Sequence, residues 1–115
     1  MEPGYLEVAV ERRGELNVLC VSGELDTVSS EGFADRVSGA VSGLTGQLLV
    51  DLSQLAFIDC AGARALQAAL ARFPYGQVMI SPLRPQIRRV LNLLSMDLGH
   101  ISAQPAEGHG RSGGS

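Results

Sequence analysis

The side chains best suited to chemistry are two carboxylates and one thiol. Asp59 directly precedes Cys60, and Asp26 follows an earlier Gly-Glu-Leu run. A carboxylate can cap a helix start or accept hydrogen bonds from donors on a partner. A thiol at a helix N-terminus ionises more readily, because the helix dipole favours the thiolate. The pattern therefore allows three readings: a recognition surface, a redox-responsive Cys60, or a Cys60 that only fills space as a small residue.

An enzyme receives little support from the same residues. A nucleophile pair of Cys60 with His100 has no orienting third group and no oxyanion motif near it. Cys20 and Cys60 show no zinc-type spacing with His100 or His109. No glycine pattern of the dinucleotide-binding or P-loop kind is present. We expect no catalysis, no metal and no cofactor, and a function that consists of binding another protein.

Length and composition limit the architecture and the class of partner. The chain has 115 residues, enough for one domain, and its 45% hydrophobic residues are sufficient for a core. The net charge is −3 and the sequence contains no basic run, which excludes the clustered cations that nucleic-acid binding needs. No apolar run approaches the roughly 18 residues of a membrane span, and no signal peptide is evident. We expect a cytoplasmic protein without membrane insertion.

The first part of the chain has the pattern of a β-hairpin followed by a helix. Large apolar residues at positions 6, 8 and 10 alternate with Glu, Ala and Glu, and a turn at 13–15 leads into the apolar run 16–21. Cys20 lies in that run and is expected in the core. Thr27, Ser29 and Ser30 are good capping residues and predict a helix start before Glu31. Its apolar face is formed by Phe33, Val37, Ala40, Val41 and Leu44.

The second part alternates strands and helices. A short apolar strand is predicted at 47–52, buried on both faces at the centre of the sheet, and a strand at 78–80. Helices are predicted at 61–73 and over the apolar positions 87, 90, 91 and 94, with Pro85 in the first turn. The order β-β-α-β-α-β-α predicts an α/β fold, a mixed sheet whose later strands are parallel and packed by helices. Residues 1–102 form this domain, and 103–115 are a flexible Gly/Ser-rich tail.

Three sequence runs together resemble the STAS family. They are VSGELD at 21–26, VDLS at 50–53 and FIDCAG at 57–62, and the segment 81–98 is similar to the last helix of the family. This family comprises the anti-sigma factor antagonists and the cytoplasmic domains of sulfate transporters. The resemblance implies a bacterial regulator that binds an anti-sigma factor, which in many systems is a serine kinase of the GHKL ATPase type. Unmodified antagonist captures the anti-sigma factor and frees the sigma factor, and phosphorylated antagonist releases it.

The chain departs from this family at the phosphorylated position. The family motif is Asp-Ser-Ser-Gly with phosphate on the second serine, and the matching residues here are Asp59, Cys60, Ala61 and Gly62. Ala61 has no hydroxyl group, so the resemblance predicts an antagonist that cannot be switched by phosphate at this position. The residues expected to bind the partner are Asp26, Thr27, Asp59, Cys60, Ala61, Gly62 and Arg64.

Several alternatives to this interpretation remain. Asp26 can instead only cap a turn or helix, and Asp59 can cap the second helix. Asp51, at the end of a central strand, is expected to accept backbone hydrogen bonds from the next loop. The whole domain can also be a STAS subunit of another regulatory or transport assembly, or a thiol switch through Cys60. Cys20 and Cys60 are expected on different elements, too far apart for a mutual disulfide.

Overall fold

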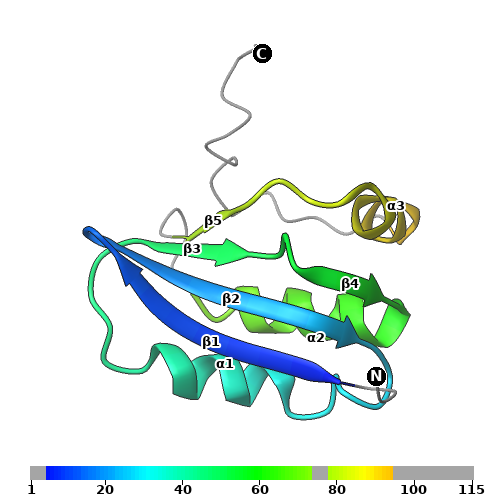
Figure 1. The fold of residues 1–115 in the computed structure, drawn as a ribbon. Coiled ribbons are helices and arrows are strands. Elements are labelled where there is room, and N and C mark those ends of the chain that lie inside the picture. The colour runs from blue at the N-terminus through cyan, green and yellow to red at the C-terminus, as the bar shows by residue number, and fades with distance from the viewer. Residues whose placement is uncertain (1–4, 74–77, 95–115) are drawn as a thin grey trace.

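The structure, a computed structural model, describes residues 5–73 and 78–94. An N-terminal hairpin is followed by three helices, with two strands between the first two helices and one strand before the last (Figure 1). They are β1 (Leu6–Arg13), β2 (Leu16–Leu25), α1 (Phe33–Val41), β3 (Leu48–Asp51), β4 (Leu55–Ile58), α2 (Cys60–Leu70), β5 (Val78–Ile80) and α3 (Pro85–Leu93). The tail predicted at 103–115, as well as His100 and His109, lies outside the described residues.

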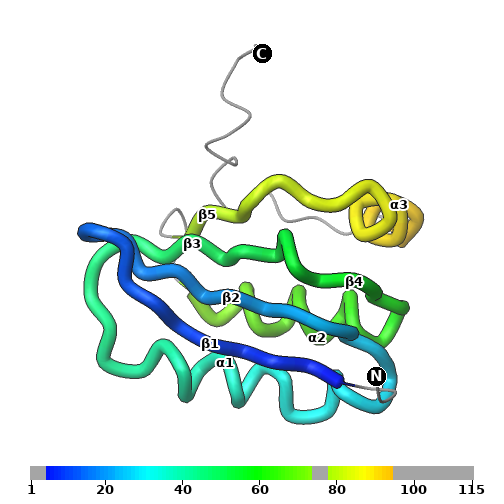
Figure 2. Tube along the Cα trace, viewed as in Figure 1, coloured from blue at the N-terminus to red at the C-terminus, as the bar shows by residue number. Residues whose placement is uncertain are grey.

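Strand β2 organises the sheet. Its residues 16–23 pair antiparallel with the whole of β1, and the connecting turn contains Gly14 at a φ of 61°. Its first half pairs parallel with β3, its last residues pair parallel with β4, and β3 pairs parallel with β5. The predicted mixed sheet with parallel later strands is therefore confirmed. The tube view shows β3 and β4 following one another along the same side of β2 (Figure 2).

A single hydrophobic core joins the sheet to the helices. Alternate residues of β2 point to one face, as the two-residue period of a strand requires. Helices α1 and α2 lie side by side along the sheet, and α3 lies against β4 and α2 (Figure 1). None of these helices is long and apolar enough to cross a membrane, as far as the described chain extends. The largest residues of this core are Leu19, Leu25, Phe33, Leu52, Leu55, Leu66, Leu70 and Ile87.

The element order contains one strand more than predicted. Strand β4 follows β3 after only three residues and precedes α2 directly. Its four residues, Leu-Ala-Phe-Ile, have the burial pattern buried, exposed, exposed, buried, so they lack the alternation typical of a strand. The pairing of β4 with β2 is irregular, with a register shift between Gly23 and Glu24. The strand is held by tertiary pairing, which a local sequence pattern does not indicate.

The helix boundaries and the core also need corrections. Helix α1 begins at Phe33 after Gly32, not near Glu31, because residues 27–32 form turns. It ends at Val41, so Leu44 lies in the following loop and is 40% exposed. Helix α2 spans Cys60–Leu70, a shift from the predicted 61–73. Pro85 occupies the first turn of α3, as predicted.

Two further core assignments were wrong. The predicted core position of Cys20 is half-buried, and its thiol donates a hydrogen bond to Glu11 Oε2 over 3.2 Å. Partial burial raises the pKa of this thiol to about 11, and the hydrogen bond to Glu11 adds to the effect. Strand β3 lies inside the sheet as predicted, but its Leu49 is only half-buried. The face opposite the helices is therefore less covered than the apolar run indicated.

Candidate functional site

Asp59 is the N-cap of α2. Its backbone is extended, with φ −117° and ψ −171°, and its Oδ1 accepts a hydrogen bond from the backbone N–H of Gly62 over 2.8 Å. This contact satisfies one of the N–H groups that a helix start leaves unpaired. The structure therefore gives Asp59 the capping role that the sequence allowed for it.

The second carboxylate oxygen of Asp59 links the start of α2 to a loop that is distant in sequence. Its Oδ2 accepts hydrogen bonds from the backbone N–H of Thr27 over 3.0 Å and from the Thr27 hydroxyl over 3.2 Å. Thr27 lies in the loop between β2 and α1, 32 positions earlier in the chain. A single side chain therefore fixes the relative position of two segments that the sequence assigned to the same surface.

Asp26 stabilises the turn that presents Thr27. Its Oδ1 accepts a hydrogen bond from the backbone N–H of Ser29 over 2.9 Å, and its own N–H donates to Ser29 Oγ over 2.9 Å. The Ser29 hydroxyl also lies 2.7 Å from the carbonyl oxygen of Glu24, to which it donates. The hydrogen bond from the Ser29 N–H holds the pKa of Asp26 below its usual value. Ser29, which the sequence suggested as a helix cap, thus serves this turn.

Gly62 allows α2 to approach β2 closely. A Cβ atom added at Gly62 would overlap the carbonyl oxygen of Leu25, the last residue of β2. The N–H of Asp59 donates to that same oxygen over 3.3 Å. Only a glycine fits here, because the start of α2 rests directly on the backbone at the end of β2.

The outer side of this arrangement is accessible. Thr27, Cys60 and Arg64 are exposed, Ala61 is half-buried, and Gly62 is buried beneath them. Cys60 is a free thiol, as is Cys20. The first two turns of α2 thus present small side chains, with Arg64 as their one charged residue. A partner can approach the helix backbone closely at this point.

Two exposed apolar residues lie close in sequence to Thr27 and Asp59 and were not identified from the sequence. Val28, next to Thr27, is 72% exposed, and Phe57, two residues before Asp59, is 47% exposed. Phe57 is paired in the β2–β4 ladder with Glu24, whose carbonyl accepts from Ser29. Large apolar groups at a surface that also carries carboxylates are typical of protein interfaces. The sequence signal for Phe57 was present in the FIDCAG run but was interpreted only as a motif.

We define the switch surface as Asp26, Thr27, Val28, Phe57, Asp59, Cys60, Ala61, Gly62 and Arg64. Nothing in the described part of the chain gathers three or more His, Cys, Asp or Glu side chains into a group that could hold a metal ion. Asp51 lies at the end of β3, where its Oδ1 accepts from the N–H of Ser53 over 2.9 Å. Partial burial raises the pKa of Asp51, but hydrogen bonds from Ser53 and Ser81 and the charge of Arg13 together leave this pKa below its usual value. Asp51 therefore has the structural role expected of it.

Comparisons with known proteins identify the family and the fold. The family model described as STAS domain matches residues 7–105. An anti-sigma factor antagonist from Mycobacterium paratuberculosis is similar at 24% identity and a TM-score of 0.69, covering 90% of this chain and 89% of that one. The anti-sigma factor antagonist SpoIIAA in its unphosphorylated form is similar at 20% identity and a TM-score of 0.50, with 76% and 83% covered.

A third similarity is to a part of a much larger protein. The murine anion transporter Slc26a9 matches at 19% identity and a TM-score of 0.56, over 76% of this chain but 14% of the transporter. A search of curated protein sequences found no match. At these identities the solved structures establish the fold, and the family model establishes the relationship across most of the sequence. The chain belongs to the STAS domain family.

Proposed function

We propose that this protein is a cytoplasmic, non-enzymatic antagonist of an anti-sigma factor, which it binds through the switch surface to control sigma-factor-dependent transcription. One observation carries the proposal. The residues that match the family's phosphorylation motif lie at a capped helix start, with Cys60 exposed and Ala61 half-buried beside it. The similarity of the whole fold to the antagonist from Mycobacterium paratuberculosis supports the same kind of partner.

The physical character of the switch surface favours a partner that combines cations with apolar side chains. The loop and cap residues Asp26 and Asp59 carry negative charge, and their hydrogen bonds hold them in place. Val28, next to Thr27, and Phe57, two residues before Asp59, are exposed apolar side chains. Large apolar side chains dominate the binding free energy of most interfaces, and charges mainly set orientation and association rate. Val28 and Phe57 are therefore the proposed anchors.

The absence of a hydroxyl group at Ala61 changes the regulation. A phosphoserine would add about −1.5 to −2 charges at the start of α2 and oppose docking of the partner there. With Ala61 in this place, the protein remains in the form that binds. Incubation with a partner kinase and ATP should leave residues 59–62 without phosphate by mass spectrometry, and Ala61→Ser should restore an acceptor.

The proposal is tested by placing a charge in the contact. In Ala61→Glu the new carboxylate should enter a desolvated interface and weaken binding of the cognate anti-sigma factor at least 100-fold, measured by titration calorimetry. The fold should persist, because an acidic residue is tolerated in the first turn of a helix. Circular dichroism and thermal unfolding check this point.

The matched control is Ala40→Glu, the same substitution at an exposed position of α1. We expect it to bind the anti-sigma factor within about 2-fold of the parent, since surface charges away from an interface change affinity little. If folded Ala61→Glu binds as tightly as Ala40→Glu, the docking surface lies elsewhere and the proposal is wrong.

A second candidate is a STAS subunit of another regulatory or transport assembly. The similarity to part of Slc26a9 favours it, because the same fold there is one portion of a transporter. The two candidates differ in what remains bound during purification from the native cell. Recovery of an anti-sigma factor supports the first, and recovery of a membrane or scaffold protein without one supports the second.

A further inference from the structure

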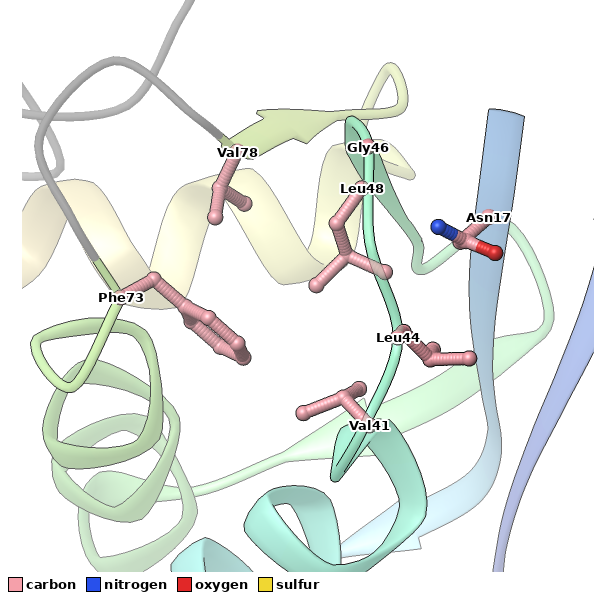
Figure 3. A pocket seen from close by; sticks show the side chains of 7 residues that line it. All are labelled: Asn17, Val41, Leu44, Gly46, Leu48, Phe73 and Val78. Carbon is pink, nitrogen blue, oxygen red and sulfur yellow. The ribbon is translucent and has the colours of Figure 1, made fainter. Parts of the chain in front are cut away.

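A hollow lies at the end of α2 opposite the switch surface. It has a volume of about 190 Å³ and is lined by residues from several segments of the chain (Figure 3). These are the end of α1 and the loop after it, the first residues of β2, β3 and β5, and the turn after α2. The ring of Phe73 and the side chains of Val41, Leu48 and Val78 surround the open space in the close-up view (Figure 3).

Of the seven described residues that line the hollow, five have apolar side chains and none is charged. Leu48 and Val78 are buried at its base, and Leu44, 40% exposed, stands at its mouth. Among the described lining residues, the one polar side chain is Asn17, which is 2% exposed. Its Nδ2 donates to the carbonyl oxygen of Thr45 over 2.7 Å and, more weakly, to that of Gln47 over 3.4 Å. Asn17 therefore holds the wall of the hollow in position and leaves the interior to apolar contacts.

Such a space is unusual in a small fold. Protein interiors are close-packed, and voids larger than one water molecule are few. Apolar cavities of about 150 Å³ are known to stay dry and to take up benzene or xenon. The hollow is also smaller than the roughly 300–1,000 Å³ of pockets for drug-sized ligands.

We propose that this hollow is a binding site for a small uncharged apolar molecule, the size of one aromatic ring or a short branched alkyl group. The site disfavours charged ligands, because none of the described lining residues carries a charge that could pair with theirs, and their desolvation would be uncompensated. Entry is from the mouth at Leu44. The site is separate from the switch surface, so this proposal does not depend on the partner proposed above.

The test uses benzene and indole as probes in a methyl NMR titration of the full chain. We expect saturable shifts for the methyl groups of Val41, Leu44, Leu48 and Val78 with a Kd of about 1 mM or tighter. Leu44→Phe and Val41→Phe should each fill the space and weaken probe binding at least 10-fold. Leu93→Phe, the same change at a position 77% exposed on α3, is the matched control and should bind as the parent does.

Several results would overturn the proposal. One is the absence of saturable shifts with both probes up to their solubility limits. Another is binding that persists unchanged in both folded filling variants, which would place the probes at a different site. If Val41→Phe does not fold, Leu44→Phe decides alone, since Leu44 lies at the mouth and is not part of the packed core.

Discussion

The two ends of α2 are built in opposite ways. At the N-terminal end, Asp59 binds the N–H of Gly62 and both donors of Thr27, and Gly62 rests on the carbonyl of Leu25. At the C-terminal end, Phe73 faces a hollow of about 190 Å³ (Figure 3). The helix has 11 residues, so these ends are only about 16 Å apart.

The two ends of α2 should therefore differ in how strongly a substitution changes the stability of the protein. The N-terminal end is held by directional hydrogen bonds and by a backbone contact that leaves no room for a side chain. Small changes there should therefore lower the free energy of unfolding strongly. At the C-terminal end, Leu66, Ala69 and Leu70 are buried in the core, but the half-buried Phe73 that follows borders the hollow, where there is room for changes in side-chain volume. The N-terminal end suits the switch surface, which must present fixed groups to a partner. The C-terminal end suits the hollow, which must accept a small ligand.

The largest effect is expected at Gly62. In Gly62→Ala the new Cβ overlaps the Leu25 carbonyl oxygen, so α2 must move away from β2 and the free energy of unfolding should fall by more than about 3 kcal/mol. Urea denaturation measures it. Gly39→Ala in α1 is the control, because nothing lies within 4 Å of its added Cβ. Since alanine is the better helix former, Gly39→Ala should stabilise by about 0.5–1 kcal/mol. Equal effects of the two would contradict the close contact.

The next effect is expected from the cap. Asp59→Ala removes the acceptor for Gly62 and Thr27 and should lower stability by about 1–2 kcal/mol. Asp59→Asn keeps an oxygen that can cap the helix at Gly62 and should lose less, although its NH2 group cannot accept from the N–H of Thr27. Thermal unfolding of both variants provides the comparison. A loss of the same size in Asp59→Asn would show that the contact with Thr27, and not capping of the helix, holds this end.

The hollow end should respond in the opposite direction to added volume. Val41→Ile places one methylene group toward the space and should stabilise by about 0.5–1 kcal/mol, as cavity-filling changes commonly do. Val37→Ile makes the same change one helical turn earlier, where Val37 is 2% exposed in the closed core. There the extra group should destabilise by about 1 kcal/mol. Chemical denaturation of the pair gives the answer, and two changes of the same sign would mean that the hollow is not available to side chains.

The smallest effect concerns pH and Asp26. Its folded-state pKa is lowered by the hydrogen bond from the Ser29 N–H, so the ionised carboxylate stabilises the fold above its unfolded-state pKa. That contribution is lost as the pH falls through the folded-state value. Asp26→Asn should therefore show a slightly weaker loss of stability than the parent when both are melted from pH 7 to pH 3. If Asp26→Asn loses as much stability as the parent between pH 7 and pH 3, Asp26 does not contribute to the pH dependence.

Periodic and local patterns were sufficient for much of the fold. The hairpin of β1 and β2, the parallel later strands and the proline at the start of α3 were all predictable. Strand β4 was not, because four apolar residues carry no period and their partner, β2, is distant in sequence. The start of α1 was misplaced because the hydroxyl of Ser29 bonds to the Asp26 turn and the Glu24 carbonyl instead of capping a helix.

The candidate site was predictable in its residue types but not in its geometry. The resemblance of the FIDCAG run and of Asp26 to the STAS family indicated which segments to consider, and the roles of these residues in binding remain proposals. The hydrogen bonds from Thr27 to Asp59 depend on how two loops meet, and no local pattern encodes that. The exposure of Val28 and Phe57 likewise follows from the turn and the irregular β4 pairing.

The central position of β2 determines which strands open before the whole molecule unfolds. It is flanked by β1 on one side and by β3 and then β4 on the other, so opening its amide hydrogen bonds separates three strand pairs. Strand β5 has only three residues and pairs with β3. Amide protons at the middle of β2 should therefore exchange with solvent deuterium only through global unfolding, and those of β5 through a cheaper local opening.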